Sequence, residues 1–192
     1  SANRAVLHLY AKYLKGKNDR RWRIEHAQVV DPEDLTLFKD YSVLPSVQPT
    51  HATSDMYWAE ERLGEERIES AYTFRQLLDQ NGMIALGSDF PVEDFNPLLG
   101  FYAAIARMDQ KGYPKGGFQI SNAISRQDAL RGMTIWAAYA NFEEKLKGSI
   151  SKGKWADFVV LDHDIMEVEP RHISAVSALR TVISGETVYL KK

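Results

Sequence analysis

The chain has 192 residues, of which 44% are hydrophobic and 26% charged, a composition typical of a folded globular protein and not of a disordered one. Its formal net charge of −2 gives no electrostatic basis for binding nucleic acid or an anionic membrane surface. Cysteine is absent, which excludes disulfides and thiolate ligands, so any metal ion must be held by His, Asp or Glu.

No stretch of the sequence approaches the run of about 18 apolar residues that a membrane-spanning helix needs. The first segment predicts an amphipathic helix without a signal-peptide cleavage site, its apolar residues at helical spacing being Ala5, Val6, Leu9, Tyr10, Tyr13 and Leu14. We therefore expect a cytoplasmic protein that binds neither nucleic acid nor membrane. Because the chain opens directly in this pattern without an initiator Met, we also expect it to be a truncated form.

Strand-like runs alternate with helix-forming segments over the first two thirds of the chain. Three runs predict strands: Trp22–Gln28, Val43–Pro49 and Met83–Asp89. Capping residues predict helix starts at Asp31-Pro32, at Ser54 or Asp55, and at Asn96-Pro97, and a helix end at Asn81-Gly82. This alternation is typical of an α/β fold.

The last third of the chain changes character. Ser125 and Asp128 form a capping-box pattern ahead of one long apolar helix over residues 129–142. Short β runs follow Lys147, with turn residues between them: Gly148–Ile150, Trp155–Leu161, Ala178–Ile183 and Thr187–Leu190. We therefore predict an α/β domain over residues 1–147 and a small β subdomain over residues 148–192.

A possible metal-ligand residue ends or follows each of the three predicted strands. His26, His51 and Asp89 lie at the carboxyl ends of these strands, where ligands bind in parallel α/β sheets and barrels. Two imidazoles and one carboxylate are a usual ligand set for zinc or a related divalent ion. Such an ion lowers the pKa of water to about 7, and Asp89 is suited to accept the proton. The pattern indicates metal-dependent hydrolysis.

Alternation within the strands predicts which face each side chain occupies. In the third strand, small residues share a face with Asp89, which we expect to be the inner face of the sheet. If His26 also points inward, then Ile24 does so too, and Arg23 and Glu25 face the helix layer. Burial of these charges is costly there, which leaves pairing with each other or with the opening helix as the alternatives.

Structural roles for these side chains remain open on the residue pattern alone. A lone histidine near a strand end is more often a hydrogen-bonded structural residue than a ligand. A Gly-Ser-Asp sequence after a strand is by itself a common turn. The other three histidines, His8, His163 and His172, are expected to face solvent.

Four segments together resemble the amidohydrolase superfamily in order and spacing. They are RIEHAQ (23–28), SVQPTH (46–51), IALGSDFPV (84–92) and the stretch from ALRGMT to FVVLD (129–162). The resemblance extends over nearly the whole chain and points to the large subgroup that includes N-substituted formamide deformylase. The tail motif is shared across many amidohydrolases and identifies the superfamily, not a substrate.

The resemblance implies the C-terminal part of a (β/α)8 TIM-type barrel over residues 1–147, and part of a small β-sandwich over residues 148–192. It implies that His26 and His51 are metal ligands after the fifth and sixth barrel strands. Asp89, after the last strand, touches the metal and acts as general acid and base. The implied activity is hydrolysis of C–N bonds in a small amide, formamide or cyclic amide with a divalent metal, expected to be zinc, one or two ions being bound in the intact enzyme.

The chain also departs from the family pattern. The His-x-His pair of the first barrel strand is absent, and a closed barrel needs about 250 residues and eight strands. We therefore expect this chain alone to be inactive, and its exposed half-barrel edges to favour self-association. The alternative function is a non-catalytic half-barrel that serves in binding or assembly. A nucleotide-binding domain is disfavoured because no glycine-rich phosphate loop follows any strand.

Overall fold

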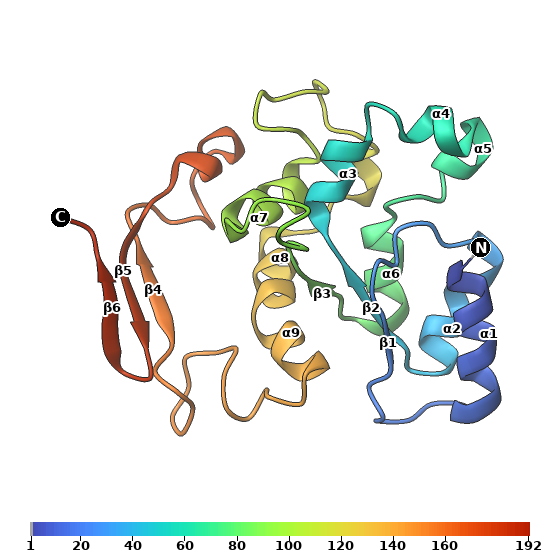
Figure 1. The fold of residues 1–192 in the computed structure, drawn as a ribbon, viewed down its shortest axis with the longest axis horizontal. Helices are drawn as coiled ribbons and strands as arrows, with labels where there is room; N and C mark the ends of the chain where they lie inside the picture. Colours follow the sequence, from blue (N-terminus) through green and yellow to red (C-terminus); the bar gives the residue numbers. More distant parts are fainter. Residues whose placement is uncertain (1) are drawn as a thin grey trace.

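The computed structural model describes residues 2–192 and has a mixed α/β fold with two three-stranded sheets (Figure 1). The first sheet is parallel, in the order β1 (Arg23–Ile24), β2 (Leu44–Val47) and β3 (Ala85–Leu86). The second is antiparallel, in the order β4 (Phe158–Leu161), β5 (Ala178–Ile183) and β6 (Glu186–Leu190). The α/β class and the β-rich end of the chain agree with the sequence analysis, whereas the boundary between residues 147 and 148 stays a prediction.

Helices surround the parallel sheet. In Figure 1, α1, α2 and α6 lie to the right of its strands, and α8 and α9 lie between it and the second sheet. None of the helices in the described part of the chain is both long and apolar enough to cross a membrane. The α-helices are α1 (Ala2–Leu14), α2 (Leu35–Asp40), α3 (Pro49–Asp55), α4 (Ala59–Leu63), α5 (Glu65–Ile68), α6 (Phe74–Asn81), α7 (Pro97–Ala106), α8 (Arg126–Met133) and α9 (Ile135–Ala140), and short 3-10 helices span Pro32–Asp34, Ile120–Asn122 and Pro170–Ala175.

Most of the predicted helix caps are confirmed. The side-chain oxygens of Asp31, Asn96 and Ser125 each accept a backbone N–H from the first turn that follows, which satisfies a donor that the helix leaves unpaired. Gly82 ends α6 in the left-handed conformation at φ 69°.

The predicted cap at Ser54 or Asp55 is wrong. Those residues lie at the end of α3, which begins at Pro49 directly after β2. Proline is favoured at the first helical position because its missing N–H has no partner there in any case. Consequently His51 lies in the first turn of a helix and not in a loop.

The predicted strands and the long helix are too long. Only Arg23–Ile24 of the first strand pairs as β structure, because the chain turns at once and His26 adopts φ 55°. The run Gly148–Ile150 forms no strand, because Gly148, at φ 86°, packs its backbone against α9. Thr134 adopts non-helical angles and divides the predicted long helix into α8 and α9.

The predicted orientation of β1 is also wrong. Ile24 faces the apolar core, and Arg23 and Glu25 line the open inner side of the sheet instead of the helix layer. Of the two pairings that the sequence left open, the one between the two charges is observed, with Arg23 Nε 2.6 Å from Glu25 Oε1. The physical reason is that burying one isoleucine is favourable, whereas burying two charged side chains is costly.

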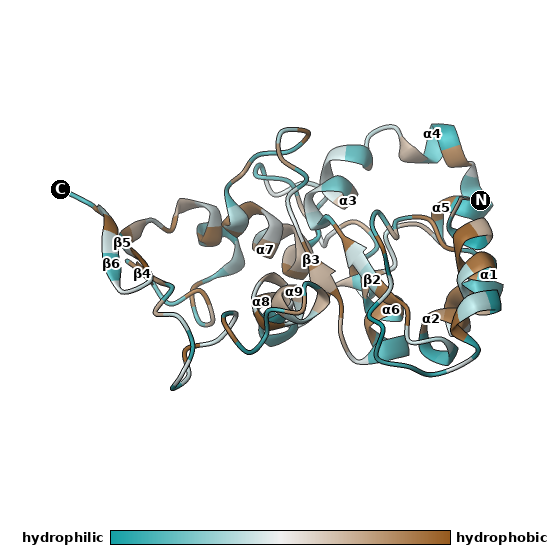
Figure 2. Cartoon of the chain, turned by 60° about the horizontal axis from the view of Figure 1, so that its bottom comes forward, coloured by the Kyte–Doolittle hydropathy of each residue, from teal (hydrophilic) through white to brown (hydrophobic). Residues whose placement is uncertain are grey.

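The core lies between the outer face of the parallel sheet and the helices. Ile24 and Val47 contribute to it from the strands, Ile84 contributes from just before β3, and aromatic and aliphatic side chains of the helices complete it. The two sides of α1 differ in hydropathy (Figure 2), and Leu7 and Leu14 point into the core. Two residues of the predicted apolar face, Leu9 and Tyr13, are instead 49% and 65% exposed.

Arg21 ties the segment before β1 to the end of α9, 118 residues further along the chain. Its guanidinium donates to the Tyr139 carbonyl and to both carboxylate oxygens of Glu144, at 2.8–3.0 Å. It also stacks over the Tyr139 ring at 3.8 Å. A mostly buried, bidentate, stacked arginine stabilises a fold more than an exposed ion pair does.

We predict that Arg21→Ala lowers the free energy of unfolding by about 1.5–3 kcal/mol, because it removes charge-assisted hydrogen bonds. Urea unfolding followed by circular dichroism measures the change. Arg20→Ala is the matched control, because the Arg20 side chain is exposed and the hydrogen bond of this residue to Asn18 Oδ1 comes from its backbone N–H. Equal stability of the two variants would refute this role of Arg21.

Candidate metal centre

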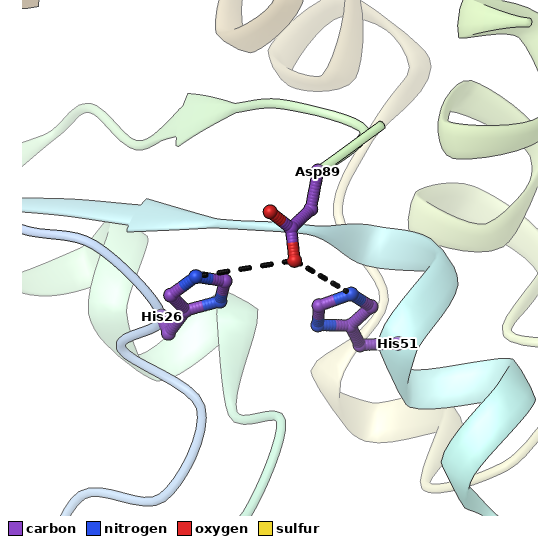
Figure 3. A group of neighbouring side chains, drawn as sticks. All are labelled: His26, His51 and Asp89. Carbon is purple, nitrogen blue, oxygen red and sulfur yellow. Dashed lines mark ion pairs between the residues drawn. The ribbon is translucent and has the colours of Figure 1, made fainter. Parts of the chain in front are cut away.

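Three elements bring His26, His51 and Asp89 together (Figure 3). His26 lies in the turn after β1, His51 in the first turn of α3, and Asp89 in the loop after β3. Asp89 Oδ2 lies 3.5 Å from His51 Nε2 and 3.9 Å from His26 Nε2. One possible ligand atom of each residue lies within 4.8 Å of the others. The two imidazole rings are parallel within 1°, with centroids 5.8 Å apart.

The parallel order of the strands explains why these residues meet. The carboxyl ends of β1, β2 and β3 lie at one edge of the sheet, so each residue that follows a strand reaches the same region. His26 and Asp89 have φ of 55° and 62°, in the left-handed region that residues other than glycine rarely adopt. Such strained conformations cluster at functional sites, where the surrounding structure enforces them.

The donor set fits a divalent cation. The His51 side chain is only 9% exposed, and its Nε2 is buried without a hydrogen-bond partner in the described structure. A buried nitrogen left without a partner is costly, and a metal ion would use its lone pair. His26 and Asp89 are 47% and 31% exposed, so the site is accessible from solvent. Two imidazole nitrogens and one carboxylate oxygen suit zinc among the common ions.

An open cavity of about 390 Å³ borders the site on the inner side of the sheet. Ala85, Gly87 and Asp89 line it, as expected for one face of the third strand, but Leu86, expected on the opposite face, lines it as well. Glu25 also lines it, but this carboxylate pairs with Arg23 and accepts a 2.5 Å hydrogen bond from Ser46 Oγ. Glu25 therefore has its own partners and lies outside the group of possible ligands.

Sequence analysis assigned no role to two neighbours of the site. Gln28 Nε2 lies 2.8 Å from His51 Nδ1, and the Gln28 position, two residues after His26 in RIEHAQ, was the available signal. Gln48 precedes α3 and lines the cavity, with its Oε1 buried and without a hydrogen-bond partner among the described residues. No local pattern pointed to Gln48, since its burial depends on the tertiary packing.

The remaining histidines lie away from this group and are exposed, as expected. His8 Nε2 lies 3.3 Å from Asp34, and His163 Nδ1 lies 3.1 Å from Asp162. His172 is exposed on the 3-10 helix near the C-terminus. Within residues 2–192, only His26, His51 and Asp89 form a group of three or more His, Asp or Glu that could hold a metal ion.

Comparison with known proteins identifies the class and then the family. A parallel α/β sheet with this donor set at its carboxyl edge is the arrangement of a metal-dependent hydrolase. The profile of the Amidohydrolase family matches residues 5–189. The chain belongs to the amidohydrolase family.

Relatives and a solved structure agree with this assignment. Protein LONG AFTER FAR-RED 3 of Arabidopsis thaliana is 39% identical over 191 residues, which are 98% of this chain and 32% of that protein. N-substituted formamide deformylase of Arthrobacter pascens is 30% identical over 118 residues, or 62% of this chain and 21% of that enzyme. An uncharacterized metal-dependent hydrolase from Pyrococcus horikoshii OT3 superposes with a TM-score of 0.76 at 30% identity, covering 89% of this chain and 34% of that structure.

The chain thus spans about a third of the length of the curated relatives that match nearly all of it. The mixed α/β fold with parallel and antiparallel sheets is similar to that of solved metal-dependent hydrolases in the family.

We predict that His26→Asn raises the stability of the metal-free chain by up to about 1 kcal/mol, because asparagine tolerates the left-handed conformation better than histidine. The same substitution removes a possible ligand, so the stabilisation that Zn²⁺ gives the unsubstituted chain is expected to disappear. Urea unfolding with and without Zn²⁺ measures both effects.

His163→Asn is the control, because His163 is exposed and its φ is not positive. This variant is expected to keep the stabilisation by Zn²⁺ and to gain none in its absence. A His26→Asn variant that retains the full zinc effect would exclude His26 from the site.

Proposed function

We propose that the chain is the C-terminal part of a TIM-type barrel in a metal-dependent hydrolase that cleaves C–N bonds in small amides, formamides or cyclic amides. The convergence of His26, His51 and Asp89 carries this proposal, together with the buried His51 Nε2 that has no hydrogen-bond partner among the described residues. The β4–β6 sheet is then part of the small β-sandwich that accompanies the barrel, with the division at residues 147 and 148.

Each of the three side chains has a proposed role. His26 and His51 bind the ion through Nε2, and Asp89 approaches it through Oδ2, the oxygen that lies toward both rings (Figure 3). A bound zinc ion supplies Lewis acidity, which polarises the substrate carbonyl and acidifies water. Histidine binds a metal ion in its neutral form.

Asp89 also serves as general base and then as general acid. Its Oδ1 points away from the His51 ring (Figure 3) and takes the proton of the water that attacks the carbonyl carbon. As the C–N bond breaks, the same oxygen returns this proton to the departing nitrogen. The products are a carboxylic acid and an amine, and Asp89 ends the cycle ionised.

The remaining barrel strands must come from outside this chain. A closed barrel has eight parallel strands, whereas the described residues contain a parallel sheet of three. We therefore propose that the 192-residue chain alone does not turn over substrate. The catalytic unit is the longer protein, of which the curated relatives suggest this chain is about a third.

Hydrolysis assays test the function. The protein encoded by the complete reading frame, loaded with Zn²⁺ or Mn²⁺, is expected to hydrolyse at least one compound from a panel of N-formyl, N-acyl and cyclic amides. Asp89→Asn in that protein is expected to lower kcat by about 10²–10⁴-fold, because it removes the general base and acid. His163→Asn is expected to leave kcat unchanged. Turnover by the 192-residue chain alone, or full activity of Asp89→Asn, would contradict the proposal.

A non-catalytic assembly module is the second candidate, because this chain exposes apolar surface. Leu9 and Tyr13 are exposed on α1, and β1 and β3 are the edge strands of the parallel sheet. An open groove of about 800 Å³ with a mainly apolar lining lies between α8, α9 and the β4–β5 pair. Edges and apolar patches of this kind favour association with another chain.

Light scattering tests self-association. The 192-residue chain is expected to form dimers or larger species at micromolar concentration, and the double variant Leu9→Glu, Tyr13→Glu is expected to shift it toward monomer. Lys12→Glu on the same helix is the control, because Lys12 is exposed but not apolar. A strictly monomeric chain would refute the assembly role and leave the metal centre unaffected.

A further inference from the structure

We propose that Gln28 is a positioning residue that fixes the orientation of the His51 ring, so that Nε2 faces the metal site. This inference rests on the proposed function, because it assigns His51 Nε2 to the metal. Gln28 itself touches neither metal nor substrate in this scheme. Its side-chain amide acts through the ring of His51.

The contact between the two side chains is close and sheltered. Gln28 Nε2 lies 2.8 Å from His51 Nδ1, and the His51 side chain is 9% exposed. With Nδ1 held by the amide, the opposite nitrogen, Nε2, is directed toward Asp89 Oδ2 at 3.5 Å. A half-turn of the ring about its Cβ–Cγ bond would place carbon atoms where Nδ1 and Nε2 lie, and would break the hydrogen bond to Gln28. The amide therefore selects one of the two ring orientations.

The backbone of Gln28 is itself fixed. Its N–H donates to the His26 carbonyl at 2.7 Å, and its carbonyl accepts the Tyr72 N–H at 2.6 Å. The next residue, Val29, forms a β-bridge with Ala71. The turn that presents His26 therefore also supplies the group that orients His51, so the two imidazoles are positioned by one segment.

A second hydrogen bond connects helix α3 with the segment that holds Gln28. Tyr72 O–H donates to Asp55 Oδ2 at 2.7 Å, and Asp55 lies one helical turn after His51 in α3. Burial, and then the hydrogen bond to Asp55, raise the pKa of Tyr72, so this hydroxyl stays protonated and remains a donor. Helix α3 is thus connected to the Gln28 segment at two points, the His51 ring and the Asp55 carboxylate.

The choice of an amide has a chemical consequence. In the orientation seen here, the NH₂ group donates to Nδ1, which places the ring proton on Nε2, opposite Asp89. Metal binding through Nε2 requires the proton on Nδ1, and the amide oxygen accepts it after a half-turn about the Cγ–Cδ bond. Glutamine can form a hydrogen bond with Nδ1 in both the metal-free and the metal-bound state, because one amide offers a donor and an acceptor. A glutamate carboxylate can only accept the Nδ1 proton of the metal-bound state, and leucine forms no hydrogen bond in either state.

Two variants separate these properties. Gln28→Leu is expected to weaken Zn²⁺ binding about 10–100-fold, the usual cost of losing a partner of a metal-binding histidine. Gln28→Glu is expected to bind Zn²⁺ at least as tightly as the unsubstituted chain, because a carboxylate accepts the Nδ1 proton. Gln76→Leu is the matched control, since Gln76 is exposed on α6 and its side chain makes no hydrogen bond in the described structure.

The experiment combines zinc competition against a chromophoric chelator with ¹⁵N NMR of the imidazole nitrogens in the 192-residue chain. The His51 ring is expected to carry its proton on Nε2 without metal and on Nδ1 with Zn²⁺. In Gln28→Leu the metal-free ring is expected to lose its single tautomer, a change that a merely structural role would not produce. Thermal unfolding of the metal-free variants verifies that each is folded, and Gln28→Glu decides the matter if Gln28→Leu does not fold.

The outcomes distinguish this inference from the proposed function. If the unsubstituted chain binds no Zn²⁺, the metal centre is wrong, and the metal-free tautomer still decides whether Gln28 orients the ring. If the chain binds Zn²⁺ and Gln28→Leu changes neither affinity nor tautomer, the inference alone is wrong. Weaker binding by Gln28→Glu than by Gln28→Leu would also overturn it.

Discussion

Parallel pairing of β1, β2 and β3 is the constraint on which the candidate site depends. No two of its side chains are close in sequence, and each is brought to the site only because its strand ends at the same edge of the sheet. The strands themselves are short, so the apolar core behind them holds the register. The candidate metal centre therefore depends on the whole parallel sheet, and no local sequence motif forms it.

Sequence patterns predicted the features that depend on short-range chemistry. The α/β class, the three helix caps at Asp31, Asn96 and Ser125, and the two C-terminal strands that form the last hairpin are determined by propensity, capping and turn residues within a few positions. The resemblance of four motifs predicted the family, which the match over residues 5–189 confirms. The proximity of His26, His51 and Asp89 followed from the general rule about strand ends, while their role as ligands stays a prediction.

Features that depend on tertiary packing were not predictable in the same way. The face of β1 was assigned wrongly because strict alternation fails at His26, where the left-handed backbone directs the histidine to the side that Arg23 and Glu25 occupy. The position of Gln28 after His26 was the only signal for that residue, and Gln48 gave none, because the contacts of both side chains depend on tertiary packing. The candidate ligands were therefore predictable from the sequence, whereas the roles of the neighbouring residues Gln28 and Gln48 were not.

The hydrogen bonds of Arg21 to Tyr139 and Glu144 have a consequence for how the chain folds. They join the segment before β1 to a helix 118 residues later, and β1 is an edge strand of the parallel sheet. Contacts of such sequence separation form slowly, because the entropy of loop closure opposes them until late in folding. During synthesis, β1 leaves the ribosome well before α9 does. In that interval the edge of β1 that does not pair with β2 is available to chaperones or to other nascent chains.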